Sequence, residues 1–182
     1  MSRSFKKICF TIFILFCSIP GLAQSSTENK YTQAAVASAH PLATQAGIAI
    51  LQQGGNAFDA AIAVTAALAV VEPYSSGIGG GGFYLLHQAA ADRHVMIDAR
   101  ERAPLRAYSD LYLDEQGEVI PGASITGASS AGIPGIPAAL VHLAAKYGNL
   151  ALSNSLAPAI RYASDGFPVD AYYQRMAVFW LK

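Results

Sequence analysis

The chain has 182 residues, of which 53% are hydrophobic and 13% charged, with 12 basic and 12 acidic side chains. This balanced charge, without a cluster of Lys or Arg, argues against nucleic acid or an anionic membrane surface as the partner, so we expect a small soluble substrate. The length is enough for one domain of ordinary size.

The first 23 residues have the pattern of a secretory signal peptide. Three basic residues precede an apolar run over residues 8–19, and Gly21 and Ala23 are the small residues of a cleavage site. Cleavage after Ala23 would leave 9 basic against 12 acidic residues, and we expect a secreted, periplasmic protein with no membrane segment. An uncleaved anchor is the alternative, but the run is short for a bilayer and Pro20 interrupts it.

Residues 24–33 are polar and are predicted to form a mobile segment. A helix is then predicted from Pro41 to about Gln53. Proline is favoured in the first turn of a helix, and Gly54 and Gly55 stand where a helix ends.

A second helix is predicted from Ala57 to Val71. Asn56 can cap its start, and Asp59 lies in the first turn, where a carboxylate is favourable. The helix is apolar on nearly every side, which is typical of a helix buried by several neighbours.

Five glycines occupy the six positions 77–82, directly after this helix. Glycines this dense imply positive φ angles or a backbone that approaches another group closely. Gly77, Gly79 and Gly82 have the GxGxxG spacing, but the dinucleotide-binding fingerprint follows a strand and opens a helix, whereas here a helix precedes and a strand follows. We therefore predict a tight connection between helix and sheet rather than a phosphate-binding loop.

The rest of the chain is predicted to mix strands and helices. The elements are a hairpin of Phe83 to His87 with His94 to Ala99, a polar turn at 114–117, a GIPGIP loop at 132–137, and helices from Pro137 to about Tyr147, from Ser155 to Ala163 and from Asp170 to the chain end. The fold class is α/β (α+β). The aromatic and apolar last residues suggest a helix cut short and an incomplete chain.

Few groups suit metal, redox or nucleophilic chemistry. Both cysteines lie in the signal peptide, so the mature chain has no thiol. The four histidines are scattered singly rather than spaced as ligands: His40, His87, His94 and His142. We predict no metal and no cofactor.

Arg100 and Arg102 close the second strand of the hairpin and face the same way. An arginine here could hold a substrate carboxylate through its planar fork of donors. The alternative is an ion pair with Asp98 or Glu101, which the residues alone favour by about two to one.

Several motifs in one order resemble a known family. The stretch HPLATQAGIAILQQGGNAFDAAIAVTAALAVVEPYSSGIGGGGFYLL, then IDARERAP, GIPGIPAAL and APAIRYASDGFPV, strongly resembles the γ-glutamyltranspeptidases, from about Ala34 to at least Val169. The resemblance implies an N-terminal nucleophile hydrolase with a four-layer αββα sandwich, incomplete in this chain. It also implies a precursor that cleaves itself into two subunits, with residues 34–182 as the N-terminal part of the large one.

The resemblance also implies where the chemistry lies. The family's catalytic threonine begins the small subunit, no stretch here matches that junction, and we expect the nucleophile beyond Lys182 and the chain alone to be inactive. The arginine that binds the α-carboxylate of the γ-glutamyl group matches Arg100, which reverses the preference for a simple ion pair. Arg102 departs from the apolar or small residue common at its position and is assigned no role.

By this resemblance the whole enzyme would cleave the γ-glutamyl amide of glutathione and pass the acyl group to water or an amino acid. Its partners would be glutathione, other γ-glutamyl compounds and the small subunit of the same precursor. Two alternatives stay open. One is a cephalosporin or glutaryl acylase of the same family, and the other is an inactive, truncated module that is not an enzyme.

Overall fold

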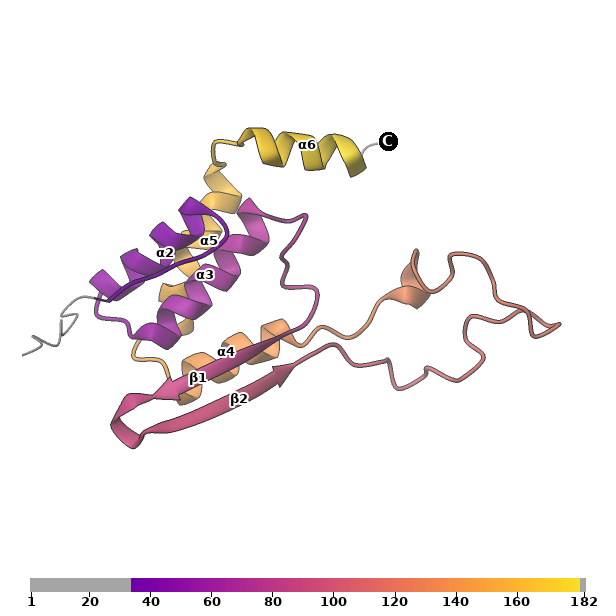
Figure 1. The fold of residues 1–182 in the computed structure, drawn as a ribbon, viewed down its shortest axis with the longest axis horizontal. Helices are drawn as coiled ribbons and strands as arrows, with labels where there is room; N and C mark the ends of the chain where they lie inside the picture. The colour runs from indigo at the N-terminus through magenta and orange to yellow at the C-terminus, as the bar shows by residue number, and fades with distance from the viewer. Residues whose placement is uncertain (1–33, 181–182) are drawn as a thin grey trace, which may run out of the picture. The chain divides into compact units, whose positions relative to one another are not determined.

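The structure, a computed structural model, describes residues 34–180, so the predicted signal peptide and the polar segment at 24–33 lie outside the described residues. The described part has five α-helices and one antiparallel pair of strands (Figure 1). In chain order these are α2 (Pro41–Gln52), α3 (Ala57–Val71), β1 (Gly82–Gln88), β2 (Arg93–Ala99), α4 (Ile136–Lys146), α5 (Leu152–Asp165) and α6 (Ala171–Trp180). This content of helix and strand confirms the α/β class. None of the described helices has the length and apolar character needed to cross a membrane.

Helix α2 begins and ends as its sequence predicts. The ring of His40 caps the N-terminus, where its Nδ1 accepts a hydrogen bond of 3.1 Å from the Leu42 backbone N–H, and Pro41 follows in the first turn. After the last turn Gly54 adopts a φ of +89°, a conformation that glycine reaches without strain.

Helix α3 begins with a capping box. The side chain of Asn56 accepts hydrogen bonds from the backbone N–H groups of Phe58 (2.8 Å) and Asp59 (3.0 Å). In return, the Asp59 carboxylate accepts one from the Asn56 N–H at 2.9 Å. Three backbone donors at the helix start are thereby satisfied within four residues of sequence, so the cap was readable from the sequence alone.

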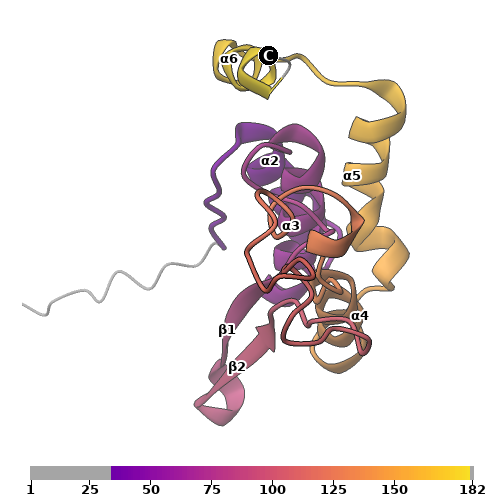
Figure 2. The same ribbon diagram turned by 90° about the vertical axis from the view of Figure 1, so that its right-hand side faces the viewer.

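The core lies around α3, which belongs to two apolar clusters. The first joins α3 to α2 and α5 through Ala43, Ala46, Ile50, Ala63, Ala66, Ala67, Val71 and Ala159. The second joins α3 to the hairpin and α4 through Ile62, Leu86, Ile136, Leu140 and Leu143. Figure 2 shows α5 running alongside α3. Each fully buried Ile or Leu stabilises the fold by about 1.5–3 kcal/mol. Because α3 contributes residues to both clusters, it holds the two halves of the core together.

Strands β1 and β2 pair in one register from Gly82 opposite Ala99 to Gln88 opposite Arg93. Alternate residues, such as Leu86, face the helices, while Phe83 and Leu85 stay 60% and 69% exposed on the other side. Helices therefore cover one face of the sheet. With two strands, residues 34–180 do not by themselves form four layers, in keeping with the incomplete sandwich expected from the sequence.

Three helix starts differ from the prediction, and α6 begins one residue late, at Ala171. Helix α4 begins one residue early, at Ile136, and α5 begins three residues early, at Leu152, so that Pro158 lies in the helix interior. A proline inside a helix removes a backbone hydrogen bond, so local preference alone would favour a later start with proline in the first turn. The fully buried Pro158 packs beside Ala159, and this burial offsets the lost bond.

Candidate functional site

Three chain segments meet at the end of β2: the glycine segment, the residues after β2 and the loop before α4. The carbonyl of Gly80 accepts hydrogen bonds from the N–H groups of Gly135 (3.1 Å) and Ile136 (3.2 Å). Arg102 and Ile133 exchange two more, at 3.1 and 2.8 Å. The junction is thus held by backbone hydrogen bonds, and these fix the backbone positions from which the side chains after β2 project.

The glycines at this junction permit close approach. None of the glycines between positions 77 and 82 has a positive φ, so conformational freedom is not what they supply. A Cβ atom on Gly135 would instead collide with the carbonyl of Ala99, and one on Gly81 would lie 2.7 Å from the Glu101 backbone nitrogen. The predicted tight connection is confirmed, and its reason is the crossing of three backbones.

The same glycines make room for the side chain of Glu101. A Cβ on Gly81 would overlap the Glu101 carboxylate, one on Gly80 would lie 3.3 Å from it, and one on Gly132 would lie 3.0 Å from the Glu101 Cβ. The Glu101 side chain is 34% exposed. Two glycine-containing segments therefore hold this carboxylate at the end of β2.

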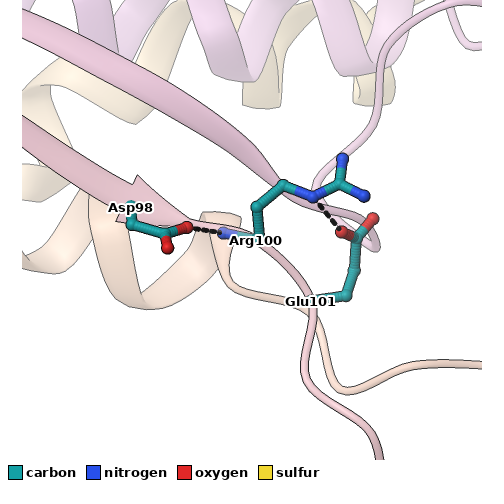
Figure 3. Close-up of polar contacts among 3 residues, drawn as sticks. All are labelled: Asp98, Arg100 and Glu101. Atoms are coloured by element: carbon teal, nitrogen blue, oxygen red, sulfur yellow. Dashed lines mark hydrogen bonds and ion pairs between the residues drawn. The ribbon is translucent and has the colours of Figure 1, made fainter.

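Arg100 lies next to this carboxylate (Figure 3). Its Nε is 3.4 Å from Oε2 of Glu101, and its backbone N–H donates to Oδ1 of Asp98 at 3.0 Å. The Arg100 side chain is 60% exposed, and an ion pair so exposed contributes at most about 1 kcal/mol to stability. Among residues 34–180 no hydrogen bond engages its two terminal nitrogens, which leaves that end of the guanidinium free to receive a carboxylate.

A cavity of about 430 Å³ opens beside Arg100, a size within the range of small-molecule sites. Its lining includes Asp98, Arg100, Arg102 and His142 among apolar residues of β2 and α4. Both arginines predicted to share a face therefore line one cavity, and Asp98 is the single acidic residue of its lining. The two arginines and the size of the cavity suit a small anionic molecule.

The histidines are not all isolated, which corrects the sequence-based prediction. His40 caps α2, and the ring of His142 lies 5.9 Å from that of Tyr147. The rings of His87 and His94, however, are only 4.5 Å apart. They are seven positions apart in sequence, and the register of the predicted hairpin was the signal that could have paired them. No group of three or more His, Cys, Asp or Glu side chains suited to a metal occurs among the described residues.

Comparison with known proteins agrees with these motifs. The family model for gamma-glutamyltranspeptidase matches residues 43–178. The chain belongs to the γ-glutamyltranspeptidase family. It is 43% identical over 137 residues to the glutathione hydrolase proenzyme of Bacillus subtilis (strain 168), which covers 75% of this chain and 23% of that protein. The crystal structure of the Helicobacter pylori γ-glutamyltranspeptidase superposes with a TM-score of 0.75 at 42% identity, covering 78% of this chain and 40% of that one.

The same family includes an acylase among the relatives of this chain. The acylase ACY 1 proenzyme of Pseudomonas sp. (strain V22) is 38% identical over 164 residues, covering 85% of this chain and 29% of that protein. The chain thus spans 23% and 29% of the length of these two curated relatives.

Proposed function

We propose that this chain is the N-terminal part of the large subunit of a γ-glutamyltranspeptidase. The complete enzyme cleaves the γ-glutamyl amide of glutathione and related compounds and transfers the acyl group to water or an amino acid. The match over residues 43–178 and the relatives named glutathione hydrolase proenzyme support this function. In this proposal the small subunit from the same precursor supplies the catalytic threonine, the enzyme is exported to the periplasm, and no cofactor takes part.

Arg100 binds the α-carboxylate of the γ-glutamyl donor. The observation that carries this role is the exposed guanidinium at the edge of the 430 Å³ cavity, with only Nε in an ion pair among residues 34–180. A carboxylate held by the planar fork of an arginine is fixed in orientation as well as in position. Arg100 thereby orients the scissile amide toward the threonine and breaks no bond itself.

Glu101 positions Arg100 in this proposal. Its carboxylate is confined by the glycines at 80, 81 and 132, and it pairs with Nε rather than with the terminal nitrogens that meet the substrate. An arginine anchored through Nε loses less side-chain freedom when it binds a carboxylate, which strengthens binding without adding a contact.

The test is substitution of Arg100 in the full-length precursor that contains this chain. Arg100→Ala removes a charge-assisted interaction with the substrate worth about 1.5–3 kcal/mol, so KM for a γ-glutamyl anilide should rise by about tenfold to a hundredfold. Arg100→Lys keeps the charge but loses the planar fork of donors, so its KM should lie between those of the unaltered enzyme and of Arg100→Ala. The matched control is Arg102→Met, a change of the neighbouring arginine, for which KM should stay within about threefold.

Two results would contradict the role of Arg100. One is an unchanged KM in Arg100→Ala, and the other is an equal rise in Arg102→Met, which would reduce the effect to loss of positive charge near the cavity. Processing of the precursor into subunits is checked on a gel for every variant, since a variant that fails to process says nothing of substrate binding.

The second candidate is an acylase acting on a glutaryl β-lactam. The 38% identity to the acylase ACY 1 proenzyme supports it, because that identity is close to the 43% found for the glutathione hydrolase. Assay of the full-length enzyme with a γ-glutamyl anilide beside a glutaryl β-lactam separates the two. Both acyl groups carry a terminal carboxylate, but the γ-glutamyl donor also carries an α-amino group that the glutaryl chain lacks, so the first proposal requires a preference for the anilide.

A further inference from the structure

His87 and His94 form a cross-strand pair near the tip of the hairpin. The register places them directly opposite each other, on the face of the sheet that the helices leave uncovered. Opposed residues on paired strands have Cβ atoms about 4.5–5.5 Å apart, and the two rings lie 4.5 Å apart between centroids with an angle of 35° between their planes. Both side chains are exposed. Within residues 34–180 the backbone therefore brings two exposed imidazoles together.

This separation suits chelation of one metal ion. A zinc–imidazole bond is about 2.0–2.1 Å long, so two nitrogens bound to one ion lie about 3 Å apart. Rotation about the side-chain torsions can bring nitrogens of rings at 4.5 Å to that separation while the strands stay paired. Chelation then costs little reorganisation, because strand pairing has already ordered the backbone on both sides.

The surroundings of the pair do not oppose a cation. The nearest basic side chain in sequence, Arg93, points to the other face of the sheet, where its guanidinium donates to Oε1 of Gln88 at 2.6 and 3.0 Å. Met96 lies two residues after His94 and so on the same face, with its side chain 60% exposed. The neighbouring group on this face is thus a thioether, itself a weak ligand for soft metals.

We propose that His87 and His94 chelate a divalent transition-metal ion on the open face of the β1–β2 hairpin. Imidazole is a ligand for Zn²⁺, Ni²⁺ and Cu²⁺, whereas Mg²⁺ and Ca²⁺ take oxygen ligands. Since no third His, Cys, Asp or Glu completes a cluster among the described residues, water fills the remaining positions. Such a site binds metal reversibly and follows the usual order of affinity, with Cu²⁺ above both Ni²⁺ and Zn²⁺.

The test is titration of the full-length, untagged protein that contains this chain, without its signal peptide and freed of metal, with Cu²⁺, Ni²⁺, Zn²⁺ and Mg²⁺ by isothermal calorimetry. We expect one equivalent of each transition metal to bind, Cu²⁺ most tightly, and no response to Mg²⁺. His87→Gln and His94→Gln should each weaken Ni²⁺ binding by at least about tenfold, and the double variant should be little worse than either, since one imidazole alone does not chelate. The control is His142→Gln, another exposed histidine, which should bind as the unaltered chain does.

Folding is checked separately from binding. Thermal unfolding without metal should be nearly the same for all variants, because both hairpin histidines are exposed, and Ni²⁺ should raise the unfolding temperature only where both are present. Unchanged Ni²⁺ affinity in His87→Gln and His94→Gln would overturn the site. Equal weakening in His142→Gln would do the same, as it would show binding to histidines in general.

Discussion

The joint between α3 and the segment after α4 depends on one buried carboxylate, that of Asp59. The side chain is fully buried, and its Oδ2 accepts hydrogen bonds of 2.9 Å from the backbone N–H groups of both Asn56 and Asn149. A longer bond of 3.4 Å reaches Oδ1 from the N–H of Leu150. Asp59→Ala would leave these donors without their acceptor in a closed part of the structure.

The expected loss of stability follows from these bonds. Hydrogen bonds to a charged group contribute about 1.5–3 kcal/mol each, and the two short ones dominate. We expect Asp59→Ala to lower the free energy of unfolding by about 3–4 kcal/mol, a large part of the roughly 5–15 kcal/mol typical of a domain. Asp59→Asn keeps one acceptor oxygen at the site and should cost about half as much.

Urea unfolding followed by circular dichroism measures this loss. With a slope of about 2 kcal/mol per molar urea, the midpoint of Asp59→Ala should fall by about 1.5–2 M. Asp114→Ala is the matched control, because Asp114 also accepts two backbone hydrogen bonds of 2.9 Å, from Gln116 and Glu118, but is exposed. Its loss should be below about 1 kcal/mol. Equal losses in the two variants would refute the argument that burial makes the Asp59 bonds strong.

Two further predictions concern the glycine junction and the sheet. Gly135→Ala should destabilise the chain by more than about 2 kcal/mol, since its Cβ would collide with the Ala99 carbonyl, while Gly79→Ala, with no atom within 4 Å of the added Cβ, should be close to neutral in the same urea assay. Burial raises the pKa of Tyr84 above 10.0, so the unfolded chain loses this proton first and stability should fall as pH rises above about 10. Tyr84→Phe should lessen that fall, and an identical pH dependence in the two proteins would exclude Tyr84 as its source.

Features set by neighbouring residues were predictable. The cap of α3 at Asn56 and Asp59, the proline in the first turn of α2 and the hairpin were all expected from sequence and are confirmed. Each depends on contacts between residues a few positions apart, or on alternation along one strand. The start of α5 was predicted three residues too late because burial of Pro158, a tertiary effect, outweighs its local preference.

The glycine segment at positions 77–82 shows where prediction from the sequence ends and the tertiary structure has to decide. Its density predicted either positive φ or close approach, and only the tertiary structure decided for close approach, since the groups that Gly81 meets lie near Glu101, twenty positions away. The ion pair of Arg100 with Glu101 was one of two readings of the same residues. Its geometry leaves the terminal nitrogens of the arginine free, so the ion pair and the proposed carboxylate site are compatible.

The sequence by itself determined the family, the α/β class and most helix boundaries, because motif order, capping and hydrophobic period are written along the chain. Only the tertiary structure decided which distant residues meet, such as Asp59 with Asn149 and Glu101 with the glycines. The physical reason is that such contacts depend on how packed helices and paired strands place residues in space. Local sequence preferences do not specify which residues far apart in the chain come into contact.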